Sequence, residues 1–284
     1  MTHQKRIAAI HDISCFGKCS LTVALPIISA MGIEVSAIPT AVLSTHTGGI
    51  GGFTYRDLTN DILPIVRHWK TLDLSFDGIY TGFLGSLEQI DIIAEVFDLL
   101  RGEKSRIVVD PVMADNGSLY AIFPDSFPKA MRRLCEKADL IVPNMTEAAL
   151  LLGESYIEGP YTPDYIAGLL RRLAGLGPRQ VVLTGVFFDH EQLGAASYDA
   201  DTDSVEHVFA GRIAGYFHGT GDVFASVVTG AMANGAALRE AVRLAVDFTV
   251  AGIARTKQAG TDIRFGVNFE AGLSKLAMNS GSYT

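Results

Sequence analysis

The chain has 284 residues, of which 48% are hydrophobic and 19% charged, and its formal net charge is −8. This composition allows a large buried core and argues against intrinsic disorder. Nucleic acid is an unexpected partner, because there is no surplus of Lys or Arg to neutralise phosphates. The three cysteines are too few for a disulfide framework and predict a reducing compartment. With no signal-peptide pattern and no apolar run long enough for a membrane span, we expect a cytoplasmic protein without a membrane segment.

Short apolar runs alternate with helical patterns along the chain. Arg6–Ile10 is predicted to be a buried strand, followed by a polar loop over residues 11–18 and a helix over Ser20–Met31. Tyr55–Trp69 predicts an amphipathic helix broken near Pro64. The other predicted strands are Ile33–Ile38, Asp77–Thr81, Arg106–Val109, Leu140–Val142 and Gln180–Leu183, with a hairpin of Leu193–Tyr198 and Val205–Phe209. The other predicted helices are Leu87–Leu100, one beginning near Ser126, one opening at residues 143–147, Thr162–Leu173, Val223–Ala233, Leu238–Arg255 and Phe269–Met278.

The alternation of strand and helix recurs at least five times. It predicts a mostly parallel sheet covered by helices on both faces, because parallel strands need crossover helices that bury the sheet. The sequence shows no internal repeat and no low-complexity linker. We therefore expect a three-layer α/β fold in one domain over residues 1–284.

The segment Phe217–Ala225 joins a polar, glycine-rich turn to an apolar helix. Gly219 and Gly221 have no Cβ, so the backbone amides around them can approach a bound anion at the positive end of the helix. Asp222 lies in the first helical turn, where a carboxylate is favoured, and we expect it to stay ionised near neutral pH. An anion site beside a carboxylate base suits phosphoryl transfer to a hydroxyl, although Asp222 could instead only cap the helix.

Polar residues also follow nearly every predicted strand, and the carboxyl ends of parallel strands share one edge of the sheet, where ligands bind. Carboxylates beside phosphates require cations between them, so we expect Asp115 and Glu147 to hold Mg²⁺, partly through water. The segment Ser44–Phe53, with four glycines at positions 48–52, is predicted to be a flap over a substrate. These strand-end residues are Asp12, Thr47, Asp110, Asp115, Asn144, Glu147, Thr184 and Asp222.

The motif Gly-Thr-Gly-Asp at residues 219–222 resembles the signature of the ribokinase superfamily. Three further blocks, in family order, resemble the pyridoxal (pyridoxine/pyridoxamine) kinases of that superfamily. These blocks are Ser44–Gly48, Asp110–Met113 with Asp115, and Pro143–Asn144 with Glu147. The resemblance spans the chain from about Ile7 to the C-terminal helices, and it implies a ribokinase-like fold with a small antiparallel edge to the sheet.

The resemblance implies ATP-dependent phosphorylation of the 5′-hydroxyl of a B6 vitamer by a homodimer. Asp222 would accept the hydroxyl proton, while the backbone of Gly219, Thr220 and Gly221 would hold the moving phosphoryl group. Val142 departs from a Thr that is common at the family's monovalent-cation site, which usually holds K⁺. The remaining implied positions are Asp110, Asp115, Asn144, Glu147, Thr184 and Gly185 for ATP and its cations, and Asp12, His46, Thr47 and Phe83 for the vitamer.

Two vitamer positions depart from the family, because many pyridoxal kinases have Ser in place of Asp12 and Tyr in place of Phe83. An ionised Asp12 would favour pyridoxamine or a protonated ring. Hydroxymethylpyrimidine kinase is the alternative within the superfamily, and a non-catalytic nucleotide-binding sensor on the same fold is the alternative from another class. The sequence lacks a Walker A motif and the protein-kinase signatures, so those classes of phosphoryl transfer are excluded.

Overall fold

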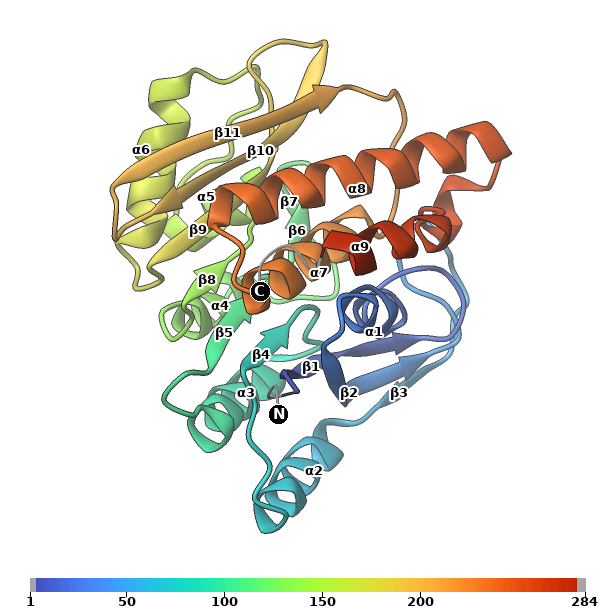
Figure 1. Cartoon of the computed structure of the whole chain (residues 1–284), viewed down its shortest axis with the longest axis vertical. Helices are drawn as coiled ribbons and strands as arrows, with labels where there is room; N and C mark the ends of the chain where they lie inside the picture. The colour runs from blue at the N-terminus through green and yellow to red at the C-terminus, as the bar shows by residue number, and fades with distance from the viewer. Residues whose placement is uncertain (1–3, 280–284) are drawn as a thin grey trace.

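The structure is a computed structural model that describes residues 4–279. Its middle layer is a nine-stranded sheet in the order β11-β10-β9-β8-β5-β4-β1-β2-β3 (Figure 1). The six strands from β9 to β2 in this order are parallel, whereas β10 and β11 at one edge and β3 at the other are antiparallel. The strands are β1 (Arg6–Ser14), β2 (Glu34–Leu43), β3 (Tyr55–Asp57), β4 (Gly78–Thr81), β5 (Arg106–Val109), β8 (Leu140–Ile141), β9 (Gln180–Val186), β10 (Gln192–Asp199) and β11 (Ser204–Gly211). A separate two-stranded sheet pairs β6 (Ala114–Asp115) with β7 (Ser118–Leu119).

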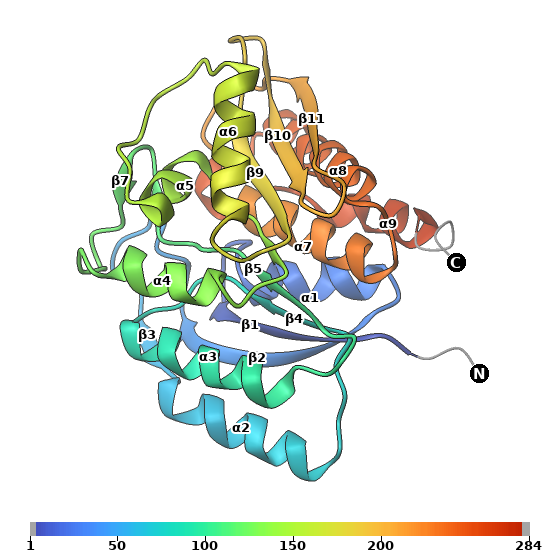
Figure 2. The same ribbon diagram turned by 90° about the vertical axis from the view of Figure 1, so that its left-hand side faces the viewer.

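Helices cover both faces of the sheet, as the turned view shows (Figure 2). One face is covered by α2 (Thr59–Thr71), α3 (Leu87–Leu100), α4 (Phe127–Cys135), α5 (Met145–Leu152) and α6 (Pro163–Ala174). The opposite face is covered by α1 (Leu21–Ala30), α7 (Thr220–Ala233), α8 (Leu238–Ala259) and α9 (Leu273–Asn279). The predicted three-layer fold with a mostly parallel sheet is confirmed. The predicted single domain remains a prediction.

Alternating side chains of the central strand β1 fill the two hydrophobic cores. Ala8 and Ile10 pack in the core under α2–α6, whereas Ile7 packs in the core under α1, α7 and α8. This follows from the two-residue period of a strand. Because both faces are buried, the strand is apolar at every position from residue 7 to 10. No helix in the described range 4–279 combines the length and hydropathy that crossing a lipid bilayer requires.

The first strand is longer than the sequence predicts. It continues to Ser14, with an irregularity in its pairing with β2 between His11 and Ile13, so Asp12 lies within the strand and not in a loop. His11, Asp12 and Ser14 are polar but buried. The change from apolar to polar residues at position 11 therefore does not mark the end of the strand.

The predicted helix Tyr55–Trp69 is wrong at its start. Tyr55–Asp57 forms the edge strand β3, which pairs antiparallel with the end of β2. Helix α2 then runs without a break from Thr59 to Thr71, although it contains Pro64. Pro64 is exposed, and so is Asn60, whose carbonyl loses its partner at the proline, so water can satisfy that carbonyl.

Candidate active site

A cavity of about 750 Å³ opens at the carboxyl ends of the parallel strands. Residues from β1, from the ends of β5 and β8, and from the start of α7 line it, so segments distant in sequence meet there. Every predicted site residue lines this cavity. These are Asp12, His46, Thr47, Phe83, Asp110, Asp115, Asn144, Glu147, Thr184, Gly185, Gly219, Thr220, Gly221 and Asp222.

The beginning of α7 provides a backbone anion site. The helix begins at Thr220, and its N-cap, Gly219, has a φ of 73°. Within the described residues no side chain caps this end, so the amides of the first turn are available to an anion. Gly219 is required for a second reason, because a Cβ there would lie 2.0 Å from the carbonyl oxygen of Lys18.

Asp222 points from this first turn into the cavity, but its ionisation differs from the expectation. The pKa of Asp222 is raised to about 7: burial is the main cause, the backbone amide of Ser20 opposes the rise, and the negative charge of Asp12 adds to it. At neutral pH Asp222 is therefore only partly ionised, less than the sequence predicts, because desolvation outweighs the helix dipole. A carboxylate with a pKa near the working pH is well suited to general-base catalysis.

Asp12 is held by two hydroxyl groups. Ser20 Oγ donates to Asp12 Oδ1 at 2.6 Å, and Ser14 Oγ donates to Oδ2 at 3.1 Å. The residue is only 4% exposed. Burial raises the pKa of Asp12, while the two hydroxyls oppose that rise. The carboxylate is thus fixed in orientation before any ligand binds.

Asn144 and Glu147 form a capping box at the start of α5. Asn144 Oδ1 accepts from the Glu147 amide at 2.9 Å, and Glu147 Oε2 accepts from the Asn144 amide at 2.9 Å. Glu147 Oε1 accepts from the amide of Met113 at 3.1 Å, so both carboxylate oxygens are occupied. Burial raises the pKa of Glu147. This carboxylate ties α5 to the segment after β5, and its backbone bonds leave fewer of its lone pairs for a metal ion.

The magnesium site predicted at Asp115 and Glu147 remains a prediction. Asp115 Oδ1 accepts from the amide of Asn116 at 2.8 Å, and Oδ2 accepts from the hydroxyl of Tyr216. Asp115 is partly exposed to the cavity. No group of three or more His, Cys, Asp or Glu residues in the described part of the chain is arranged to hold a metal ion. A cation that keeps most of its water shell, as Mg²⁺ does, fits these two carboxylates better than a fully protein-bound one.

Asp110 is a buried carboxylate at the end of β5. Burial raises its pKa well above the usual range, and the charges of Glu147 and Asp222 raise it further. No Lys or Arg among the described residues forms an ion pair with it. A monovalent cation would supply the missing positive charge, but K⁺ at this position remains a prediction.

His46 is held by the protein through both ring nitrogens. The amide of Gly48 donates to Nδ1 at 3.0 Å, and Nε2 contacts the carbonyl oxygen of Arg264. Because Nδ1 accepts, Nε2 must be the protonated nitrogen. The ring centroid of His218 lies 5.4 Å away, and a Cβ on Gly48 would collide with that ring. His46 can therefore offer a ligand its ring but no free nitrogen, and the flap over residues 44–53 remains a prediction.

The cavity also contains residues that sequence reasoning missed. Arg212 is the one Lys or Arg among the described residues that line it, and its guanidinium carbon lies 5.1 Å from the ring centroid of Phe187. Ser14 could have been found, because residues i and i+2 of a strand share a face and Ser14 is two positions after Asp12. The lining from α8 had no sequence signal, because it is an apolar helix face like any other. It consists of Val246, Thr249, Val250 and Ile253.

A cavity at the carboxyl edge of a parallel sheet, with a glycine-capped helix start beside a buried carboxylate, defines a small-molecule kinase of the ribokinase-like fold. A profile described as phosphomethylpyrimidine kinase matches residues 25–266. The chain belongs to the phosphomethylpyrimidine kinase family.

Solved structures and curated relatives agree with this family. A putative phosphomethylpyrimidine kinase from Bacteroides thetaiotaomicron, crystallised with pyridoxal, is 40% identical with a TM-score of 0.92, and the match covers 96% of each chain. The pyridoxal kinase of Lactobacillus plantarum is 33% identical with a TM-score of 0.89, covering 98% of this chain and 99% of that one. Pyridoxine kinase of Bacillus subtilis is 29% identical over 63% of this chain, which spans 65% of that protein's length. The predicted resemblance to pyridoxal kinases is confirmed.

Proposed function

We propose that this protein transfers the γ-phosphoryl group of ATP to the 5′-hydroxyl of a B6 vitamer: pyridoxal, pyridoxine or pyridoxamine. The observation that carries the proposal is the start of α7, where free backbone amides and the Asp222 carboxylate face the same cavity. The pyridoxal-bound relative with 40% identity supports the substrate class. Pyridoxal kinase of Staphylococcus aureus, which shares the fold, was solved with ADP, in keeping with ATP as the donor.

In this mechanism Asp222 accepts the proton of the 5′-hydroxyl. The hydroxyl oxygen attacks the γ-phosphorus, the bond from that phosphorus to the β,γ-bridging oxygen breaks, and ADP leaves. The amides of Gly219, Thr220 and Gly221 hold the charge that develops on the transferring group. Because the pKa of Asp222 is about 7, the base is substantially ionised at neutral pH yet basic enough to take a proton.

The vitamer ring would lie between Asp12, His46, Thr47 and Phe83. The Phe83 ring is supported by Phe123, whose centroid is 5.8 Å away. Asp12 presents a carboxylate that is already oriented by two hydroxyls. It would meet the ring nitrogen or another donor of the vitamer, and its charge would favour a protonated ligand.

The nucleotide would lie toward Thr184 and Gly185, with Asn144 near its phosphates. Asp115 and, through water, Glu147 would hold Mg²⁺, which when bound neutralises and orients the phosphates. Asp110 would hold a monovalent cation. Arg212 would add a positive charge at the cavity wall, where like-signed carboxylates otherwise dominate.

Hydroxymethylpyrimidine kinase is the second candidate, because the chain belongs to the phosphomethylpyrimidine kinase family and a Rhizobium meliloti hydroxymethylpyrimidine/phosphomethylpyrimidine kinase is 27% identical over 84% of this chain. Purified protein assayed with ATP against pyridoxal, pyridoxine, pyridoxamine and hydroxymethylpyrimidine decides between them. We expect kcat/KM for the best vitamer to exceed that for hydroxymethylpyrimidine by about tenfold or more. A preference for hydroxymethylpyrimidine would favour the second candidate, and no turnover of any vitamer would refute the first.

Assembly and location are separate proposals. We infer a cytoplasmic homodimer from the resemblance to the pyridoxal kinases. Light scattering on the purified protein measures the oligomeric state, and a monomer at micromolar concentration would refute the proposed homodimer.

A further inference from the structure

Ser20 has a backbone conformation that L residues rarely adopt. Its φ is 57° and its ψ is −131°, a region that suits glycine. Ser20 is the N-cap of α1, yet its side chain makes no capping hydrogen bond to that helix. Strained backbone of this kind persists only where the surrounding structure enforces it, and it concentrates at functional sites. The contacts of the Ser20 hydroxyl and amide indicate the role of this strained conformation.

Ser20 contacts both carboxylates that the reaction would need. Its hydroxyl donates to Asp12 at 2.6 Å, and its backbone amide lies close enough to Asp222 to lower the pKa of that carboxyl. Asp12 lies on β1 and Asp222 on α7. Within the described part of the chain, no other residue interacts in this way with both carboxylates. A residue in an ordinary helical or extended conformation would direct its amide differently from this φ and ψ.

The loop before Ser20 is held in place by the packing of Lys18. The carbonyl oxygen of Lys18 lies so close to residue 219 that only a glycine fits there. The Lys18 backbone also packs against Gly266, where a Cβ would be 2.7 Å from Lys18 Cβ. The Lys18 amide donates to the carbonyl of Phe265 at 3.1 Å. The loop is thus held between the beginning of α7 and the segment after α8.

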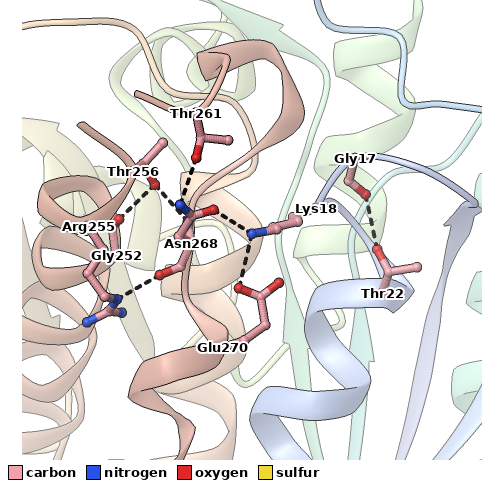
Figure 3. A network of polar contacts seen from close by, with 9 residues as sticks. All are labelled: Gly17, Lys18, Thr22, Gly252, Arg255, Thr256, Thr261, Asn268 and Glu270. Atoms are coloured by element: carbon pink, nitrogen blue, oxygen red, sulfur yellow. Dashed lines mark hydrogen bonds and ion pairs between the residues drawn. The ribbon is translucent and has the colours of Figure 1, made fainter. Parts of the chain in front are cut away.

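The Lys18 side chain extends this brace into the C-terminal part of the chain (Figure 3). Its Nζ donates to Asn268 Oδ1 at 2.7 Å and to Glu270 Oε2 at 3.0 Å. Asn268 is itself fixed: its amide donates to Thr256 Oγ1 at 2.7 Å, and its carbonyl accepts from Arg255 Nε at 2.8 Å. Both of these partners belong to α8. The network therefore connects a long, well-packed helix to the loop that carries Ser20.

We propose that Ser20 is a positioning residue for phosphoryl transfer, which fixes the Asp222 base and the Asp12 carboxylate relative to one another through a strained backbone braced at Lys18. The proposal rests on the proposed function for the roles of these two carboxylates. It assigns the hydroxyl to the orientation of Asp12 and the backbone amide to the orientation of Asp222.

The groups around Asp222 make the Ser20 amide important for the pKa of that carboxyl. Among the described residues, the ionisable groups recognised as neighbours of Asp222 through their charge interactions are Asp12, Cys19, Tyr80 and Asp110, and none of these four is a cation. A donor to the ionised form lowers a pKa, so loosening the Ser20 amide should raise the pKa of Asp222. Activity that requires the ionised base would then begin to fall at a higher pH.

Three variants separate the two halves of the proposal. Ser20→Ala removes the hydroxyl and keeps a Cβ, so the backbone remains constrained. Ser20→Gly removes the hydroxyl and the Cβ, so the backbone still fits this conformation but is no longer restricted in its alternatives. Ser14→Ala is the matched control, because Ser14 donates to the other oxygen of Asp12 from an ordinary strand position.

For all three variants we expect the vitamer KM to rise about fivefold, the loss typical of one hydrogen bond. Only Ser20→Gly should also move the acidic limb of the kcat/KM profile upward, by about 0.5 pH unit or more. Ser20→Gly should have a Tm higher by about 2–4 °C, because glycine relieves the strain. A merely structural role would make stability and activity change in the same direction. Lys18→Met, which keeps the stem but removes the ammonium, should reproduce the upward pH shift without the rise in KM.

In the kinetic measurements, the proposal would be overturned by identical pH profiles for Ser20→Gly and Ser20→Ala, or by an unchanged vitamer KM in Ser20→Ala. Titration of the Asp222 carboxyl by NMR in ¹³C-aspartate-labelled protein, assigned with Asp222→Asn, needs no substrate. If the wild type turned over no vitamer but the carboxyl still titrated higher in Ser20→Gly, the proposed function would fail while the positioning role stood. An unchanged carboxyl titration in Ser20→Gly would refute the role of the amide whatever the substrate.

Discussion

The cavity has two ends that differ in how their polar atoms are satisfied. At the end near β1, which we call the carboxylate end, Asp12 and His46 already use their oxygens and ring nitrogens in bonds to Ser14, Ser20, Gly48 and Arg264. At the end near β10, β11 and α8, which we call the apolar end, the lining is mostly hydrocarbon and glycine. Its residues include Leu193, Gly194, Gly211, Val246, Val250 and Ile253.

The difference indicates that the carboxylate end orients a ligand through fixed polar groups, whereas the apolar end accommodates a ligand through its shape. Polar groups that are held before binding lose little freedom when a ligand arrives, so the carboxylate end can position a small ring and its hydroxyl. At the other end Thr249 Oγ1 has no partner among the described residues, and Gly185 has open space on its Cβ side. A nucleotide would have to supply the contacts there, and apolar surface would cover its base.

The largest expected effect comes from removing the base at the carboxylate end. Asp222→Ala should lower kcat by about a hundredfold or more, because general-base catalysis contributes effects of this size. ATP affinity should survive, since the apolar end is untouched. Steady-state kinetics with calorimetric titration of ATP measures both quantities. Turnover close to that of the wild type would remove Asp222 from its role.

The pH dependence tests the same carboxylate without a mutation. The pKa of Asp222 is raised, so below about pH 7 the carboxyl is protonated and cannot accept a proton. We therefore expect kcat/KM to fall about tenfold per pH unit below pH 7, and not only below pH 4. A profile measured from pH 5 to 9, with the stability of the protein checked at each pH, gives the answer. A limb centred near 4 would show that Asp222 behaves as an ordinary exposed carboxyl.

A charge at the apolar end should change the KM for ATP more than the KM for the vitamer. Leu193 is 37% exposed on β10, so a substitution there should spare the core. Leu193→Glu should raise the KM for ATP about tenfold, because a carboxylate replaces apolar surface and repels the polyphosphate. Leu193→Met, which keeps the apolar area, is the control and should change little. Equal rises in KM for ATP and for the vitamer would contradict the division between the ends.

The smallest effect concerns the choice among vitamers. Asp12→Ser removes the charge but keeps a hydroxyl, so kcat/KM for pyridoxamine relative to pyridoxal should fall by about three- to tenfold. Kinetics with all three vitamers at one pH provides the comparison. Unchanged ratios would show that the charge of Asp12 does not select the substrate.

The sequence by itself determined the layers of the fold and much of the cavity lining. Strand and helix periods are local, so the helix Leu87–Leu100 and the strand Arg106–Val109 have the predicted bounds. The carboxyl ends of parallel strands share one edge of the sheet, which is why the sequence alone predicts Asp110 and Asn144 at that edge. The sequence also predicts an anion site beside a carboxylate from the glycine and aspartate at the start of α7, because this role depends only on the helix end.

Only the tertiary structure decided the ionisation of Asp222 and the contacts of Ser20. A pKa depends on the groups that exclude water, and those around Asp222 come from β1, from the loop before α1 and from the segment after β5. The positive φ of Ser20 has no signature in the sequence, because serine does not favour it, and the preceding residue but one, Lys18, packs against Gly219 and Gly266, which are distant in the chain. Sequence patterns report the preferences of neighbours along the chain, whereas desolvation and strain arise from neighbours in space.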